Sequence, residues 1–320
     1  MAPTLVTLGD LVADLIVPID ALPIQAQQHQ LAHDMTIEAG STGSVLILAA
    51  RLGLRARALG VLGQDLYGQH VRAALAASGV DTGGVVAPPG GRTTTSIGLV
   101  DDAGQHVFVW MRGTGQPQHF DPAWRPIVEQ AGAIFSTGYA LQPLATFTPT
   151  AVLEGITIAH THNIPVFFDL GPAANHAKRA HVDSAIGQAT VFLATGEEIA
   201  GWTGLADPQR AAREMLSRGP TMVVVKLGAD GCLIVTPDQE QQIEAFPVSV
   251  RNTAGAGDAF SAACMYGYLQ GYSLRQIGLL ANAAGGLTVA QLGTGTCLPQ
   301  RAAIAELLAR HGHTFVAATE

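Results

Sequence analysis

The sequence predicts an α/β protein with three layers, a mostly parallel central sheet between two layers of helices, and a small additional β-sheet. The main observation is an alternation of strand-like and helical stretches from Ala133 onwards. The run Thr221–Lys226 is almost continuously β-branched, which is typical of a strand buried on both faces. Two extended stretches, near residues 12–37 and 93–111, do not fit the alternation. We therefore assign them to a separate small sheet that could cover a site.

The first half of the chain contains a strand, two helices and the extended stretches. Apolar residues at helical spacing follow Gly40 and stop at Gly53, and Asp65 is a suitable N-cap for the next helix. The turn Asp101–Gly104 predicts a hairpin. In order, we expect strands at 4–8, 11–17 and 31–37, a helix at 45–54, a strand at 57–62, a helix that ends at residue 77, and hairpin strands at 93–100 and 106–111.

In the second half, apolar strand-like runs alternate with helical stretches. The segment Phe246–Val250 is also β-like, so the glycines after it would lie between a strand and a helix. We expect strands at 133–136, 165–169, 191–194, 221–226 and 232–236, and helices at 149–160, from 195 onwards, and at 209–218, 260–269, 274–291 and 301–310.

Several polar or glycine residues come directly after these strands. They are Asp10, Asp169, Thr195, Gly228 and Gly255. In an open α/β sheet, ligands bind beyond the carboxyl ends of the strands. We therefore expect these residues to gather along one edge of the sheet, where a site would form.

The stretch Asn252–Asp258 has the composition of a phosphate-binding turn. Gly255, Ala256 and Gly257 would let backbone N–H groups approach a ligand at the positive end of a helix. Asp258 could take a proton from an attacking hydroxyl group. An anion cradle beside a base suits the transfer of a phosphoryl group to an alcohol. The alternative from these residues alone is a glycine-rich turn in which Asp258 caps the helix.

Composition limits the classes of function. The 320 residues are 48% hydrophobic and 13% charged, so a large core is available. The net charge of −8 argues against nucleic acid or an anionic membrane as a partner. Cys232, Cys264 and Cys297 lack metal-site spacing and are expected to be free thiols. Without a recognisable signal peptide or membrane-spanning run, we expect a cytoplasmic protein.

Other catalytic classes lack their signatures. No G-x-G-x-x-G follows the first strand, as a dinucleotide oxidoreductase would require. Neither Lys178 nor Lys226 follows a glycine, so a P-loop is absent from the sequence. No H-E-x-x-H or C-x-x-C motif supports a zinc hydrolase.

Taken together, these motifs resemble those of the PfkB family, the ribokinase-like carbohydrate kinases. The strongest is N-T-A-G-A-G-D-A-F at residues 252–260, and A-G-S-T-G-S at 39–44 is similar to the family's N-terminal signature. The turn K-L-G-A-D-G at 226–231 and A-N-A-A at 281–284 also match. The resemblance covers the whole chain. It implies one kinase domain over residues 1–320, with a lid formed by segments of about 12–38 and 92–113.

The resemblance also implies an activity and the residues that perform it. A kinase of this family transfers the γ-phosphoryl group of ATP, with Mg²⁺, to a hydroxyl of a small sugar or sugar acid. Asp258 would be the base, and the N–H groups from Ala256 to Asp258 the anion hole. By motif match, the acceptor would meet Asp14, Gly40 and Ser44, the nucleotide would meet Lys226, Gly228, Gly231 and Asn282, and Glu198 would hold Mg²⁺ with its waters.

The chain departs from the family pattern at four positions. Ser44 replaces an Asn, which alters sugar specificity, and Thr195 replaces the Asn of the N-x-x-E metal motif. Asn252 replaces an Asp that binds a potassium-type ion in relatives, so we do not expect activation by a monovalent cation. Val12 makes the pocket less polar than a ribose-specific one.

The acceptor has more than one possible identity. The strand before Arg112 resembles the lid strand of 2-keto-3-deoxygluconate kinases, so Arg112 could bind a carboxylate. An exposed arginine at a strand end is the alternative. A nucleoside kinase would instead stack a base near Val12, Trp110 or Phe168. A third possibility is a non-catalytic ligand-binding member of the family. Relatives often pair through the lid, which predicts a possible homodimer.

Overall fold

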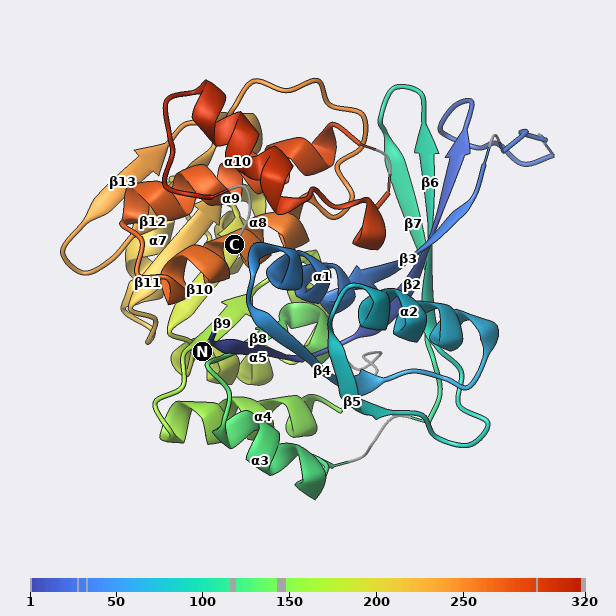
Figure 1. Ribbon diagram of the computed structural model, residues 1–320, viewed down its shortest axis with the longest axis horizontal. Coiled ribbons are helices and arrows are strands. Elements are labelled where there is room, and N and C mark those ends of the chain that lie inside the picture. The colour runs from blue at the N-terminus through green and yellow to red at the C-terminus, as the bar shows by residue number, and fades with distance from the viewer. Residues whose placement is uncertain are drawn as a thin grey trace.

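The computed structural model describes residues 2–27, 29–32, 34–115, 119–142, 148–291 and 293–317. Its main body is a nine-stranded sheet with the order β13-β12-β11-β10-β9-β8-β1-β4-β5 (Figure 1). The strands from β11 to β5 pair in parallel, and β12 and β13 add an antiparallel edge. The predicted class, with a mostly parallel sheet between helices, is confirmed.

The strands of the central sheet are β1 (Thr4–Leu8), β4 (Arg55–Val61), β5 (Asp81–Val86), β8 (Ala133–Thr137), β9 (Val166–Asp169), β10 (Val191–Thr195), β11 (Met222–Lys226), β12 (Cys232–Val235) and β13 (Glu240–Ile243). The helices are α1 (Thr42–Leu52), α2 (Leu66–Ala77), α3 (Arg125–Glu129), α4 (Pro149–Thr161), α5 (Arg179–Gly187), α6 (Gly196–Thr203), α7 (Pro208–Leu216), α8 (Ala256–Leu269), α9 (Leu274–Val289) and α10 (Arg301–Arg310). Short 3₁₀ helices include η2 (Gly138–Leu141) and η5 (Gly295–Cys297).

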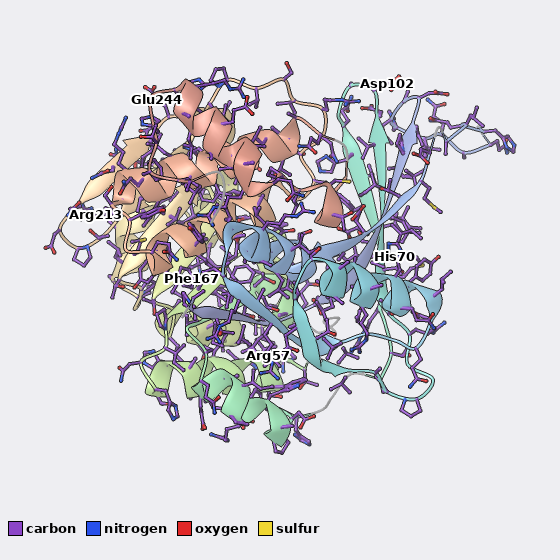
Figure 2. All side chains as sticks on the ribbon, viewed as in Figure 1. Arg57, His70, Asp102, Phe167, Arg213 and Glu244 are labelled. Carbon is purple, nitrogen blue, oxygen red and sulfur yellow. The ribbon has the colours of Figure 1, made fainter. Side chains whose placement is uncertain are left out.

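Each face of the sheet is covered by its own group of helices. Helices α1, α8, α9 and α10 bury one face, and α3 to α7 bury the other. Successive strand residues alternate between the two cores, so Phe167 packs in the first and Phe168 in the second. Figure 2 labels Phe167 within the body of the protein. Because both faces are buried, strands such as β11 are apolar almost throughout.

A second, four-stranded sheet has the order β3-β2-β6-β7 and stands to one side of the main body (Figure 1). Its strands are β2 (Leu11–Ile19), β3 (Thr36–Ser41), β6 (Thr94–Asp101) and β7 (His106–Met111). Asp102 lies at the tip of the β6–β7 hairpin (Figure 2). One face of the sheet packs on α1 and α2 through Leu11, Leu46 and Val71. The extended segments that did not fit the alternation thus form the separate small sheet that was predicted.

Some sequence expectations about elements are wrong. The strand expected at 31–37 lies at Thr36–Ser41. Of the described residues before it, Ala32 forms only an isolated bridge to Ile19. Phe246–Val250 is not a strand, and the glycine turn connects a loop to α8. Helix α8 begins at Ala256 rather than Phe260. The sequence reading also missed β5, β13, α3 and α5, which are short or contain few apolar residues at a regular spacing.

Within the described residues, every helix is too short or too polar to cross a lipid bilayer.

Candidate active site

A cavity of about 460 Å³ lies where the carboxyl ends of the central strands meet the small sheet. The main body contributes the ends of its strands and the N-terminal end of α8, around Gly255–Asp258, which we call the mouth of the helix. The small sheet contributes its inner face. The described residues that line the cavity are Val12, Asp14, Ser41, Ser96, His106, Phe108, Trp110, Thr137, Tyr139, Asp169, Gly171, Pro172, Thr195, Glu198, Lys226, Thr253, Ala254, Gly255, Gly257, Asp258 and Thr294. Of the five residues expected to gather after strands, Asp169, Thr195 and Gly255 line this cavity, whereas Asp10 and Gly228 are not among the described residues of its lining. Gly255 follows a loop rather than a strand.

The mouth of α8 forms the floor of this cavity. Gly255 is the N-cap residue and has φ +75°, a left-handed conformation that favours glycine. A Cβ at this position would also lie 3.1 Å from Thr294 Cγ2. Glycine at position 255 therefore allows both the left-handed turn and the close approach of this turn to Thr294.

The first turn of α8 presents backbone N–H groups to the cavity. The Ala256 N–H, which was expected in the anion hole, instead donates to Thr253 O at 3.3 Å. The first bond within the helix runs from Ala259 N to Gly255 O at 2.9 Å. The N–H groups of Gly257 and Asp258 have no acceptor inside the helix, because they belong to its first turn. Together with the helix dipole, they are suited to an anion.

Asp258 lies in this first turn and faces a cluster of carboxylates. Burial, together with the charges of Asp169 and Asp14, raises the pKa of Asp258 to about 8, against the opposing effect of Lys226. A carboxyl group with a pKa near neutrality is well matched to accepting a proton from an alcohol. Asp258 makes no capping hydrogen bond to the helix, so the helix-cap interpretation is not supported.

An ion pair joins Lys226, at the end of β11, to Asp169, at the end of β9, with β10 between the two strands. Lys226 Nζ lies 2.7 Å from Asp169 Oδ2, and the side chains of both residues are 11% exposed. The same oxygen accepts a hydrogen bond from Ser261 Oγ of α8 at 2.7 Å. Burial alone would lower the pKa of Lys226, but the carboxylates of Asp169, Glu198 and Asp258 outweigh it and raise that pKa. The lysine is therefore held in its charged form.

Glu198 reaches the cavity from the start of α6. Thr195 and Glu198 form a reciprocal capping box, in which Thr195 N donates to Glu198 Oε2 at 2.8 Å and Glu198 N donates to Thr195 Oγ1 at 3.1 Å. Burial raises the pKa of Glu198, Lys226 lowers it, and Asp169 raises it again. Thr195, which replaces an Asn, thus keeps Glu198 oriented by capping the helix.

The described residues contain no group of three acidic, histidine or cysteine side chains that could hold a metal by themselves. Mg²⁺ is commonly bound through one or two carboxylates, with phosphate oxygens and waters as the other ligands. The carboxylate of Glu198 fits an ion of that kind, which would arrive with a nucleotide.

Asp14 enters the cavity from β2. Thr294 Oγ1 donates to Asp14 Oδ2 at 3.2 Å. The pKa of Asp14 is raised to about 7, mainly by burial; the hydrogen bond from Thr294 works against this rise and the charge of Glu38 adds to it. A Cβ on Gly40 would lie 1.9 Å from Asp14 Oδ2, so Gly40 provides the space for this carboxyl group and does not itself line the cavity.

Ser44 lies outside the cavity lining and is completely buried. Its Oγ donates to Ala39 O at 2.9 Å and accepts from Gly295 N at 3.1 Å. The hydroxyl group therefore joins β3, α1 and η5. Ser44 therefore does not contact the cavity itself. Its hydrogen bond with Gly295 holds the segment in which the neighbouring residue, Thr294, lines the cavity.

The inner face of β7 forms an aromatic wall, made of His106, Phe108 and Trp110. Trp110 stacks on Tyr139 of η2, with ring centroids 5.2 Å apart and an angle of 14° between the planes. Of the three positions considered as a stacking platform, Val12 and Trp110 line the cavity. Phe168 does not, because it is fully buried in the core.

Arg112 follows β7 in register with Phe108 and Trp110, since side chains alternate along a strand. It is exposed and is not among the described residues that line the cavity. A carboxylate-binding role for Arg112 stays a prediction.

The residues expected beside the nucleotide follow β11 and lie on α9. Gly228 has φ +60° with open space around it, whereas a Cβ on Gly231 would lie 2.0 Å from Ile243 O. Asn282 donates to Ile243 O at 3.0 Å and to Glu244 O at 3.1 Å. Asn282 thus fixes the segment after β13, and none of the three residues lines the cavity.

Asn252 is completely buried behind the glycine turn. Its Oδ1 accepts from Ala254 N at 3.0 Å, and its Nδ2 lacks a hydrogen-bond partner within the described chain. A buried amide N–H group carries a partial positive charge, which is unsuited to binding a cation. Independence from monovalent cations stays a prediction.

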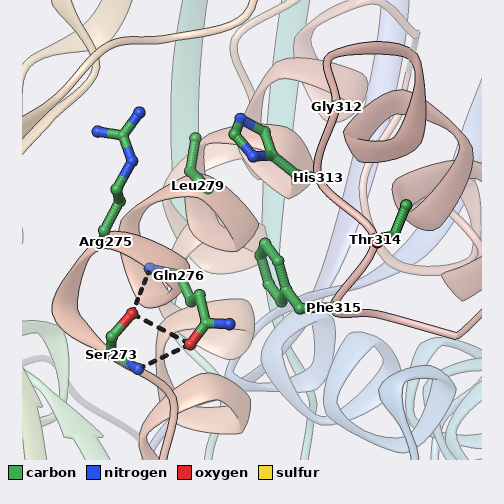
Figure 3. A pocket seen from close by; sticks show the side chains of 8 residues that line it. All are labelled: Ser273, Arg275, Gln276, Leu279, Gly312, His313, Thr314 and Phe315. Atoms are coloured by element: carbon green, nitrogen blue, oxygen red, sulfur yellow. Dashed lines mark hydrogen bonds between the residues drawn. The ribbon is translucent and has the colours of Figure 1, made fainter.

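A second cavity, of about 480 Å³, lies between the start of α9 and the segment after α10 (Figure 3). Its wall includes Ser273 and Gln276, whose reciprocal hydrogen bonds cap α9. The described lining contains no carboxylate and none of the residues that the motifs identify. The cavity at the mouth of α8 is therefore the candidate active site.

Sequence reasoning gave no site role to several residues that line the cavity, among them Asp169, Tyr139 and Thr294. Asp169 was recognised as a strand-end residue but received no role, although it is the partner of Lys226. Tyr139 and Thr294 have no motif around them, and only the fold brings them to the cavity. Burial and the charges of Asp258, Glu198 and Asp169 raise the pKa of Tyr139, which places its phenol group among the carboxylates.

Comparison with known proteins gives a consistent result. A family model described as pfkB family carbohydrate kinase matches residues 2–301. The chain is 26% identical over 300 residues to a nucleoside kinase of Methanothermobacter thermautotrophicus, and the match covers 92% of each chain. It is 29% identical over 286 residues to fructokinase-1 of Zea mays, covering 84% of this chain and 87% of that one.

The fold has close counterparts among solved structures. The structure of Arabidopsis thaliana ribokinase complexed with ribose and ATP matches with a TM-score of 0.81 and 23% sequence identity. The match covers 96% of this chain and 99% of that chain. At this identity the likeness concerns the fold, including the division into a central sheet and a small sheet.

Proposed function

Because this chain belongs to the pfkB family of carbohydrate kinases, we propose that it transfers the γ-phosphoryl group of ATP to a hydroxyl of a sugar or sugar acid. The observation that carries the proposal is the position of Asp258 at the mouth of α8, inside a cavity large enough for small-molecule ligands. A carboxylate and unpaired N–H groups meet at this point, as phosphoryl transfer to an alcohol requires.

In the proposed reaction, the acceptor hydroxyl gives its proton to Asp258. Its oxygen forms a bond to the γ-phosphorus while the bond from phosphorus to the β–γ bridging oxygen breaks, and ADP leaves with that electron pair. The N–H groups of Gly257 and Asp258 stabilise the charge on the transferred group, with Gly255 and Ala256 shaping the turn. The nucleotide would approach along Lys226, Gly228 and Gly231, with Asn282 supporting that side.

Magnesium fits this scheme through Glu198. When bound with ATP, the ion would neutralise part of the phosphate charge, and Glu198 would hold it with its waters. The capping box with Thr195 keeps the Glu198 carboxylate in place for this task.

The acceptor would bind between Asp14 and the inner face of the small sheet, which would act as a lid that excludes water. Asp14 would accept hydrogen bonds from sugar hydroxyls, with Gly40 and Ser44 supporting its position. If the acceptor is a sugar acid, Arg112 would bind its carboxylate, because a guanidinium pairs well with a carboxylate.

A nucleoside is the second candidate acceptor. The aromatic wall of His106, Phe108 and Trp110 favours it, because a base can stack on such rings. The similarity to a nucleoside kinase is a further reason to include nucleosides among the test compounds.

The test is ADP release with ATP, Mg²⁺ and a panel of sugars, sugar acids and nucleosides. If the protein is a sugar-acid kinase, Arg112→Ala should raise the KM for the acceptor. If it is a nucleoside kinase, Trp110→Ala should raise the KM for the nucleoside. Unchanged acceptor KM in Arg112→Ala would remove the carboxylate role. No turnover with any compound, alongside tight ligand binding, would instead favour a non-catalytic binding protein.

We also propose that the protein pairs through the small sheet. β7 is an edge strand, and the residues on its outer face are apolar and exposed: Val107 is 48%, Val109 51% and Met111 46% exposed. An uncovered edge strand of this kind favours pairing with a second strand.

A further inference from the structure

Lys226 occupies an unusual position in the candidate active site. It ends β11, and its side chain crosses β10 to reach Asp169 at the end of β9. Among the described residues that line the cavity, Lys226 is the only lysine or arginine, whereas Asp14, Asp169, Glu198 and Asp258 supply carboxylates. A buried ion pair is a poor source of stability compared with apolar packing. Its position beside the reacting groups therefore indicates a functional role.

The ammonium group lies next to the mouth of α8. A Cβ added to Gly257 would lie 3.6 Å from Lys226 Nζ. An anion held by the N–H groups of Gly257 and Asp258 would therefore be close to the lysine. In the described structure, Nζ donates to Asp169, and an ammonium has three N–H donors, so donors remain for a ligand.

The position of the lysine is fixed from the same helix. Asp169 Oδ2 accepts from both Lys226 Nζ and Ser261 Oγ, each at 2.7 Å. Ser261 lies one turn after Asp258 on α8. Asp169 therefore ties the ammonium to the helix that carries the base and the anion-binding N–H groups.

We propose that Lys226 is a catalytic residue whose ammonium group donates hydrogen bonds to the phosphoryl group during its transfer, with Asp169 and Ser261 as positioning residues. This inference rests on the proposed kinase function. Lys226 stays protonated throughout: the acceptor proton goes to Asp258, and the electron pair of the broken P–O bond leaves with ADP. The fixed positive charge stabilises the transition state, because negative charge spreads over the phosphoryl oxygens there.

The test compares Lys226→Met with Lys178→Met, using the acceptor that the wild-type enzyme phosphorylates fastest. Lys178 is exposed at the start of α5 and is the other lysine of the chain, so it is a matched control. We expect kcat to fall about 10²–10³-fold in Lys226→Met, the loss typical of removing one donor to a developing charge. The KM values for ATP and acceptor should change much less, and Lys178→Met should resemble the wild type.

A double variant separates catalysis from simple charge pairing. If Lys226 only neutralises Asp169, then Lys226→Met with Asp169→Asn should recover kcat, because no unpaired buried charge remains. If Lys226 acts on the phosphoryl group, the double variant stays as slow as Lys226→Met. Circular dichroism and thermal unfolding of each variant confirm that a folded protein is measured.

Two results would overturn the proposal: a wild-type kcat in folded Lys226→Met, or recovery of kcat in the double variant. Failure of the kinase function itself would appear earlier and differently, as absence of turnover by the wild-type enzyme. In that case, slow release of phosphate from ATP to water serves as the readout for the same variants, and equal rates in the wild type and Lys226→Met would overturn the role of Lys226.

Discussion

At the scale of single residues, the candidate site depends on how Asp258 is charged. Its carboxyl group lies among other carboxylates at the bottom of a cavity, and a lysine offsets part of their effect. The fold thus holds a carboxylate in a place where its charged form is unfavourable. Such a group is a better proton acceptor than an exposed carboxylate, which would already be fully ionised and weakly basic.

Replacing Asp258 with Asn should abolish most of the activity. We expect kcat to fall by about 10²–10⁴-fold, the usual contribution of a general base, with little change in ATP binding. Steady-state kinetics and calorimetric titration with ATP measure the two effects. Asp102→Asn, at the exposed tip of the β6–β7 hairpin, is the control. Retained activity in Asp258→Asn would exclude Asp258 as the base.

The raised pKa of Asp258 also predicts the pH dependence of activity. The base must be deprotonated to act, so kcat/KM should rise with pH and level off above about pH 8, the pKa of this group in the free protein. Asp14, with a pKa of about 7, would steepen the fall at lower pH. Initial rates from pH 5 to pH 9 test this. A profile that is flat above pH 5 would contradict the assignment.

The same pKa shift has a consequence for stability. The pKa of Asp258 is raised in the folded protein, so its contribution to stability is present below its ordinary pKa of 3.8 and is lost as pH rises through about 8. Asp258→Asn should therefore raise Tm most at pH 8 and above, with the gain disappearing near pH 4. Thermal unfolding at both pH values measures it, and an equal Tm difference at both would argue against the shift.

At the scale of elements, helix α8 is flanked by two left-handed glycines with different surroundings. Gly255, at its start, has φ +75° and faces Thr294, whereas Gly271, just after its end, has φ +71° and open space around it. Both positions would impose a similar backbone cost on a substituted alanine, about 1–2 kcal/mol. A comparison of the two thus separates backbone strain from damage to the site.

We expect Gly255→Ala to lower kcat by about 10²-fold, because a small displacement of the helix mouth misplaces the reacting groups. Gly271→Ala should lose a similar amount of stability but keep its kcat. Kinetics and thermal unfolding of both variants give the comparison. Equal kcat losses in the two variants would show that general destabilisation, not the geometry of the turn, is responsible.

At the scale of the whole molecule, the small sheet has two different faces at β7. The inner face carries the aromatic wall of the cavity, and the outer face carries Val107, Val109 and Met111. Pairing through this edge would bury the outer face and hold the inner face over the site. The proposed lid and the proposed dimer would then be parts of one arrangement.

Light scattering after size-exclusion chromatography should therefore give about twice the 33.1 kDa mass of one chain. Val109→Lys should shift the protein towards a monomer, because a charge cannot be buried cheaply at such an edge. Leu66→Lys, at an exposed position on α2, serves as a control for an added charge. A wild-type protein that is monomeric at micromolar concentration would exclude the dimer.

The sequence alone determined the layered α/β class and predicted the candidate site at the carboxyl ends of the strands, because hydrophobic periodicity and the succession of strands and helices are local properties of the chain. Its motifs also include Asp258, Gly255, Glu198 and Lys226, which line the candidate cavity. Short or weakly patterned elements such as β5 and α5 escaped it, since their formation depends on neighbours that are distant in sequence.

Only the tertiary structure decided which side chains meet. Asp169 pairs with Lys226, a residue 57 positions away, and Thr294 bonds to Asp14 across 280 positions. It also showed that Ser44 and Asn282 hold backbone segments without lining the cavity, whereas Trp110 and Tyr139 form part of its wall. Contacts of this kind arise from the way in which the two sheets pack, and no local pattern of residues encodes them.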